Sequence, residues 1–165
     1  MRGKRGLVVV PALIVVVVDQ LTKAIVLDRM TLHQSIPVID GFFAFTYVRN
    51  TGAAFGIFAG YSPALRVPAL LAVATVALGV LLWFVRTVPL ERRAVIAACG
   101  GVLGGAIGNM VDRAAYGEVI DFLDVYLGAY HWPAFNVADA AITVGVIVLC
   151  LDALRGAPAP ERSLG

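Results

Sequence analysis

Four long apolar stretches, separated by segments that hold most of the polar residues, organise this chain. The stretches are Leu7–Leu27, Leu65–Val85, Ala94–Val111 and Phe135–Leu154. Each is close to the roughly 20 residues that a helix needs to cross a hydrocarbon core. The pattern predicts an α-helical integral membrane protein with four transmembrane helices, folded as a single domain over residues 1–165.

The connections between the stretches differ in length and composition. Residues 28–64 and 112–134 form two long segments, and residues 155–165 form a short tail after the last stretch. The part from Ser35 to Arg49 is rich in β-branched and aromatic residues punctuated by Pro and Gly, which predicts a small β-rich element. Rings such as Phe42 and Tyr47 are equally consistent with an aromatic belt at a membrane interface.

The composition supports the membrane assignment, because 60% of the 165 residues are hydrophobic and 15% are charged. The net charge of +2 comes without a basic cluster interleaved with aromatic residues, so we expect no nucleic-acid partner.

The basic start followed by an apolar run is typical of a secretory signal peptide. However, Asp19–Lys23 stands where a cleavage site of small residues belongs, so we expect the first span to be retained.

The basic residues predict how the chain is oriented, since cytoplasmic flanks hold more Lys and Arg than translocated ones. Most of them fall on one side of a four-span arrangement, which makes that side, with both termini, the cytoplasmic one. Residues 28–64 and 112–134 then lie outside. The residues on the basic side are Arg2, Lys4, Arg5, Arg86, Arg92, Arg93, Arg155 and Arg162.

Two acidic residues are the main candidates for chemistry. Asp139 stands one turn inside the fourth apolar stretch, past the position of a helix cap, where an ionised carboxylate is costly and indicates a function. Asp121 lies with Asp124 in the connection before that stretch, which we expect to be a loop. If Asp121 and Asp139 meet at one membrane face, one can hold a proton while the other acts as a base.

Other polar residues sit near the same ends of the spans, and each has a structural alternative. Asp19 and Lys23 share a helix face and could form a structural salt bridge. Asp112 and Arg113 could simply end the third helix, an explanation that does not cover Asn109. Asn136 could be only an N-terminal cap of the fourth helix.

Small residues form two further patterns. Gly100, Gly104 and Gly108 recur every four residues in the third stretch, beside a parallel row of Gly101 and Gly105. Such rows let membrane helices pack closely, although a glycine face could also leave room for a substrate helix. Residues 51–56, between the strand-rich segment and the second span, are small enough for the backbone to approach a ligand.

Several classes of chemistry lack the residues they need. The two histidines, His33 and His131, stand apart and outside a metal-binding pattern, so we expect no metal and no cofactor. No nucleophilic serine motif or nucleotide-binding loop occurs. Two other functions stay open, a proton-coupled transporter and a nonenzymatic membrane assembly factor, but the ionisable residues cluster in the outer halves of the spans, which argues against a conduction path.

Five motifs in order resemble those of bacterial lipoprotein signal peptidase, or signal peptidase II, and together cover nearly the whole chain. They are Asp19-Gln20-Leu21-Thr22-Lys23, Arg49-Asn50-Thr51-Gly52-Ala53-Ala54-Phe55-Gly56, Gly104-Gly105-Ala106-Ile107-Gly108-Asn109-Met110-Val111-Asp112-Arg113, Val119-Ile120-Asp121-Phe122 and Phe135-Asn136-Val137-Ala138-Asp139.

The resemblance implies an aspartic endopeptidase of the bacterial inner membrane that cuts diacylglyceryl-modified prolipoproteins before the lipidated cysteine. Its partners would be these prolipoproteins and membrane lipid, with the protein acting as a monomer. Asp121 and Asp139 match the catalytic pair, although the sequence does not say which is acid and which is base. The positions that match site-lining or supporting residues are Asn50, Gly105, Asn109, Asp112, Arg113, Asn136, Ala138, Asp19 and Lys23.

Overall fold

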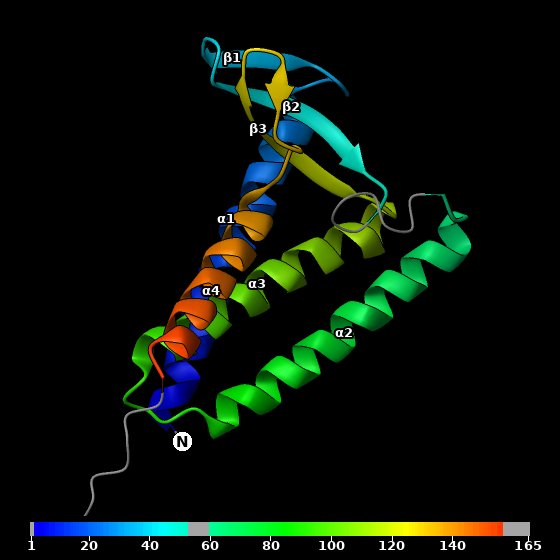
Figure 1. Ribbon diagram of the computed structural model, residues 1–165. Helices are drawn as coiled ribbons and strands as arrows, with labels where there is room; N and C mark the ends of the chain where they lie inside the picture. Colours follow the sequence, from blue (N-terminus) through cyan, green and yellow to red (C-terminus); the bar gives the residue numbers. More distant parts are fainter. Residues whose placement is uncertain (1, 53–59, 157–165) are drawn as a thin grey trace, which may run out of the picture.

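Four long helices form the body of the protein in the computed structural model, which describes residues 2–52 and 60–156 (Figure 1). They are α1 (Arg2–Arg29), α2 (Pro63–Thr87), α3 (Arg93–Tyr116) and α4 (Val137–Leu154). Each is long and apolar enough to cross a membrane, which confirms the predicted four-span fold.

The helix ends differ from those read off the hydropathy pattern. Helix α3 continues past Val111 to Tyr116 and is capped by Gly117 in the left-handed region, at φ 75°. The explanation that Asp112 and Arg113 end the helix is therefore wrong. Hydropathy marks the part of a helix that suits lipid, whereas the helix itself continues until a residue such as Gly117 terminates its hydrogen bonds.

Helix α3 is the centre of the bundle, because it packs against each of the other three helices. Its glycines allow this close packing. A Cβ on Gly104 would collide with the backbone of α1 at Ala12, and one on Gly105 would collide with the backbone of α4 at Ala138. The packing interpretation of the glycine row therefore holds for these positions, which leave no room for a substrate helix.

A small antiparallel sheet sits at one end of the bundle, as the strand-rich segment predicts (Figure 1). Its order is β1 (Ser35–Ile39), β2 (Phe43–Asn50), β3 (Val119–Leu127) and β4 (Tyr130–His131). The expectation of a loop around Asp121 and Asp124 is wrong, because both residues belong to β3. This strand pairs with β2, far away in the sequence, and local composition does not reveal such a partner.

The sheet rests on the end of α1 through a compact apolar cluster. Val26 of α1 packs there with Tyr47 of β2 and with Ile120 and Phe122 of β3, all buried. Consequently the beginning of β3, where Asp121 lies, is fixed relative to the helices.

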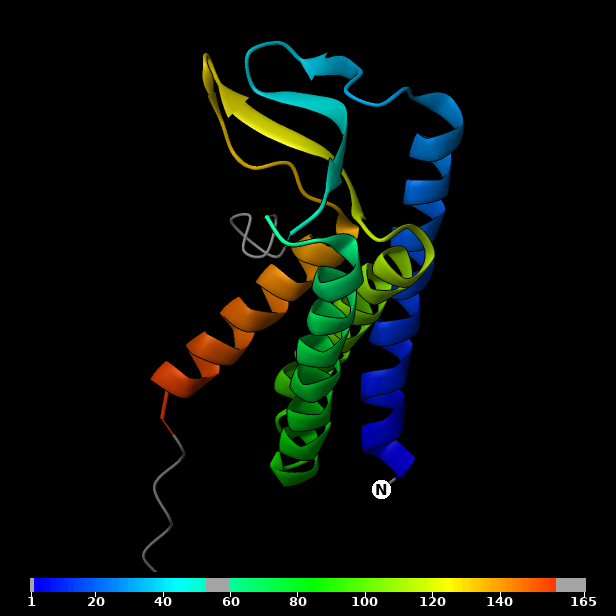
Figure 2. The same ribbon diagram turned by 90° about the vertical axis from the view of Figure 1, so that its right-hand side faces the viewer.

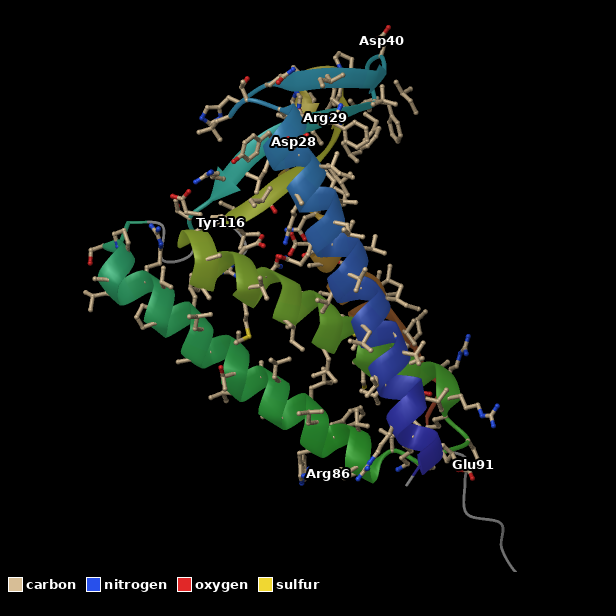
Figure 3. All side chains as sticks on the ribbon, turned by 180° about the vertical axis from the view of Figure 1, so that it is seen from behind. Asp28, Arg29, Asp40, Arg86, Glu91 and Tyr116 are labelled. Carbon is tan, nitrogen blue, oxygen red and sulfur yellow. The ribbon has the colours of Figure 1, made fainter. Side chains whose placement is uncertain are left out.

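The two ends of the bundle are chemically different. Figure 3 shows Asp28, Arg29 and Asp40 at the sheet end and Arg86 and Glu91 at the opposite end. The N-terminus and the last turn of α4 also lie away from the sheet (Figure 1). Helices α1 and α4 meet near the sheet and diverge as they run from it (Figure 2).

Candidate active site

Asp121 and Asp139 come together where β3 meets the beginning of α4, with Asn136 between them. The Asn136 side-chain amide donates to Asp121 Oδ1 at 2.7 Å, and its Oδ1 accepts the backbone N–H of Asp139 at 2.9 Å. One side chain thus contacts both acidic residues. The strand fixes one acid and the helix end fixes the other.

Asn136 is the N-cap of α4, and Asp139 completes a capping box with it. Asp139 lies past the N-cap, as expected, but it also takes part in capping, because its Oδ2 accepts the backbone N–H of Asn136 at 3.4 Å. That bond is long, whereas Asp139 Oδ1 accepts a hydrogen bond of 2.7 Å from Asn109. Capping therefore occupies only one oxygen of this carboxylate, and only weakly.

Burial and, after it, the charge of the neighbouring Asp139 carboxylate together raise the pKa of Asp121 to about 7. Hydrogen bonds from Asn50 and Asn136 and the charge of Lys23 oppose this rise. Asp121 has only 1% of its surface exposed. Near neutral pH the two carboxyl groups together are therefore suited to hold one proton.

A buried ion cluster supports the acidic pair from the other side. Lys23 Nζ lies 2.8 Å from Asp19 Oδ2 and 2.7 Å from Asp112 Oδ2, and all three side chains are at most 2% exposed. The predicted pairing of Asp19 with Lys23 is confirmed, and Asp112 joins it. Buried charges in such a cluster depend on one another, since removing one leaves the others unpaired.

Asn109 connects this ion cluster to the acids. Its Oδ1 accepts from Lys23 Nζ at 3.1 Å and from Asn136 Nδ2 at 3.1 Å. With two donors facing the oxygen, the amide nitrogen turns toward Asp139. The cluster thereby sets the orientation of a group that contacts the acidic pair.

The ion cluster also fixes the backbone near each acid. Asp19 Oδ1 accepts the N–H of Ala138 at 3.0 Å, and Asp112 Oδ2 accepts the N–H of Ile120 at 3.1 Å. Ala138 directly precedes Asp139, and Ile120 directly precedes Asp121. Ala138 is completely buried, so a larger side chain has no room there.

Asn50 and Arg113 hold the segment that follows β2. Asn50 donates to Asp121 Oδ2 at 3.1 Å and accepts the N–H of Gly52 at 3.0 Å. Arg113 Nη2 donates to the carbonyl of Gly52 at 3.1 Å. Residues 53–56, most of the predicted small-residue stretch, lie outside the described residues.

The structure adds one residue to the site and separates another from it. Gln20, which was not among the predicted site residues, donates to Asp112 Oδ1 at 3.0 Å and to the carbonyl of Gly108 at 3.2 Å. Its position beside Asp19 in an apolar span was the available signal. Asp124 instead contacts Thr46 at 3.0 Å and His131 at 2.9 Å, elsewhere on the sheet.

A pocket of about 590 Å³ opens beside Asp139. Polar side chains line one part of it, including Asn50, Asn109 and Arg113, while the rest is apolar. The apolar lining is Val119, Trp132, Pro133, Ala134, Phe135, Ala140, Ile142 and Val144. Such a pocket combines groups for acid–base chemistry with a surface for an apolar ligand. Within the described ranges, no three His, Cys, Asp or Glu side chains gather to hold a metal ion.

Comparisons with known proteins show the family to which the chain belongs. The family model described as signal peptidase (SPase) II matches residues 11–155. A lipoprotein signal peptidase of Desulforapulum autotrophicum is 48% identical over 82% of this chain and 83% of its own length. One from Geobacter sulfurreducens is 51% identical over 84% of this chain and 86% of its own length.

The fold is similar to that of solved proteins as well. A bacterial membrane enzyme determined by the in meso method at 2.3 Å resolution superimposes with a TM-score of 0.82 and 33% identity, over 91% of this chain and 88% of that one. The family model covers β3 and α4, which carry the acidic pair. The chain therefore belongs to the signal peptidase II family and is a membrane peptidase of the aspartic type.

Proposed function

We propose that this protein removes signal peptides from diacylglyceryl-modified prolipoproteins by cutting before the lipidated cysteine. The observation that carries the proposal is the pair of acidic residues that Asn136 joins, since its side chain contacts the Asp121 carboxyl and the backbone N–H of Asp139. Asp139 lines the pocket. The names of the relatives support the substrate class. The apolar part of the pocket suits a substrate that arrives from the membrane.

In the proposed reaction, the two acids activate a water molecule directly. The ionised carboxylate takes a proton from water, which attacks the scissile carbonyl, and the protonated carboxyl group donates a hydrogen bond to the carbonyl oxygen as charge develops there. With a pKa of about 7, Asp121 is suited to hold the shared proton near neutral pH. Asp139, which lines the pocket, then contacts the water.

The supporting residues keep this geometry while the substrate binds. Asn109 and Asn136 hold the two carboxyl groups in fixed orientations, so little reorganisation is needed during the reaction. Arg113 and Asn50 hold the Gly52 segment at the pocket, where it is suited to contact the substrate backbone.

We further propose that the sheet end faces outward and that both termini are cytoplasmic. The support is the distribution of basic residues, with Arg86 at the end opposite the sheet in Figure 3. In this orientation the pocket lies at the outer membrane face, where the end of a membrane-anchored signal peptide is presented.

The arrangement of buried polar groups argues against a transporter. Among the described residues, the buried charged and polar side chains all lie in the half of the bundle near the sheet. They are Asp19, Lys23, Arg66, Asn109, Asp112, Asp121, Asp124 and Asn136. A proton path needs polar groups across the whole membrane, and the opposite half does not supply them.

Cleavage of a lipid-modified prolipoprotein by purified protein in detergent tests the function. We expect Asp121→Asn and Asp139→Asn to lower the rate by at least about a hundredfold, as loss of an acid or base typically does. Asp124→Asn is the matched control, because this acid lies on the same strand but contacts Thr46 and His131 instead. Full activity in either of the first two variants, with folding verified, would contradict the proposal.

A further inference from the structure

The Thr143 hydroxyl of α4 lacks a hydrogen bond that comparable residues have. Thr22, Thr75 and Thr87 also lie in helices, and each donates to a carbonyl three or four residues earlier, at 2.7–2.9 Å. Within the described part of the chain, the Thr143 hydroxyl has no hydrogen-bond partner. It is exposed and lines the pocket instead.

Thr143 lies on the same face of α4 as Asp139. Thr143 follows Asp139 by four positions, so it is one helical turn, or about 6 Å, farther from the sheet. At this depth the other lining residues from α4 are Ala140, Ile142 and Val144, all apolar. The hydroxyl is therefore an isolated donor in the part of the pocket that lies deepest in the membrane.

An isolated donor in apolar surroundings loses free energy relative to one that is hydrogen-bonded. A ligand with a carbonyl oxygen at this depth would recover that loss. The diacylglyceryl group is such a ligand, because each fatty-acid ester contributes a carbonyl oxygen within a largely apolar molecule. The group hangs from the cysteine by several covalent bonds of about 1.5 Å each, which is enough to reach one helical turn below the scissile bond.

We propose that the Thr143 hydroxyl donates a hydrogen bond to an ester carbonyl of the diacylglyceryl group and thereby helps to select lipid-modified substrates. The inference rests on the proposed function, since it names a recognition contact of the same pocket. Recognition through Thr143 would set the depth of the lipid and so align the following peptide bond with Asp139. A peptide carbonyl of the signal sequence offers the same acceptor chemistry and is the competing source.

Two synthetic substrates with the same peptide separate these sources. One has glyceryl esters and the other has glyceryl ethers, which lack the carbonyl oxygens. We expect Thr143→Val to raise KM roughly two- to tenfold for the ester substrate, the range of one hydrogen bond, and to leave KM for the ether substrate unchanged. Thr143→Ser, which keeps the hydroxyl, is the matched control and should behave like the wild type.

The possible results have distinct meanings. An equal rise of KM for both substrates would assign the hydroxyl to a peptide carbonyl and overturn the proposal. An unchanged KM for the ester substrate would also overturn it. A wild-type enzyme that cleaves neither substrate would instead remove the proposed function itself. Thermal unfolding of each variant shows whether the substitution has disturbed the fold.

Discussion

Replacing Asp121 by Asn should change how the stability of the protein depends on pH. In the folded protein the pKa of this carboxyl is about 7, against an ordinary value of 3.8, chiefly because the group is buried. The folded state therefore favours the protonated form. Ionisation destabilises the fold, so the stability that protonation supports is complete below pH 3.8 and is lost as the pH rises through 7.

The size of the effect follows from the two pKa values. A difference of about 3 between folded and unfolded states corresponds to about 4 kcal/mol, at about 1.4 kcal/mol for each pH unit. Wild-type protein should thus lose up to about 4 kcal/mol from this group between pH 4 and pH 8. Asp121→Asn removes the loss. The amide also places a donor against the Asn50 or Asn136 amide, which costs about 1–3 kcal/mol at every pH.

The free energy of unfolding can be measured in mixed detergent micelles with circular dichroism of the helices, at pH 4 and at pH 8. The decisive quantity is the difference between variant and wild type at each pH, because the constant cost of the amide cancels between the two. We expect this difference to move in favour of Asp121→Asn by up to about 4 kcal/mol at the higher pH. Asp28→Asn, at an exposed site, should show almost no such change. A difference that stays the same at both pH values would refute the reasoning.

Three other predictions follow from the packing and the charges. Gly104→Ala should lower the free energy of unfolding by roughly 1–3 kcal/mol, because the new methyl group meets the α1 backbone. Gly79→Ala, where nothing lies within 4 Å, should not lower the free energy of unfolding. Equal losses in the two variants would contradict the packing argument. Lys23→Met should lower the free energy of unfolding by about 3–5 kcal/mol, because it leaves buried carboxylates unpaired. Arg29→Met, at an exposed ion pair, should lower the free energy of unfolding by under about 1 kcal/mol. The cleavage rate of wild-type enzyme should fall as the pH rises above about 7, because the acidic pair loses its proton; a rate that keeps rising to pH 9 would argue against a protonated carboxyl group.

The sequence alone determined the membrane architecture. Apolar stretches of about 20 residues have few alternatives to spanning helices, because a helix satisfies its backbone hydrogen bonds within its own segment when it lies in lipid. The β-rich character of Ser35–Ile39 and Phe43–Asn50 was also readable from composition. These features are local, so neighbouring residues carry the information. The five motifs identified the family for the same reason, since residue types and spacing are visible without a structure.

Tertiary structure decided what the polar residues contact. Asp121 belongs to a strand because β2 pairs with it, and Asp19 reaches Ala138 across more than a hundred residues. Tertiary structure also distinguished Asp121 from Asp124, which are only three residues apart in the sequence. Contacts between distant segments depend on how helices and sheet pack, and a sequence pattern records only periodicity along one element. The sequence therefore specified which groups the site would use, and the packing of α1, α3, α4 and β3 determined which of them meet.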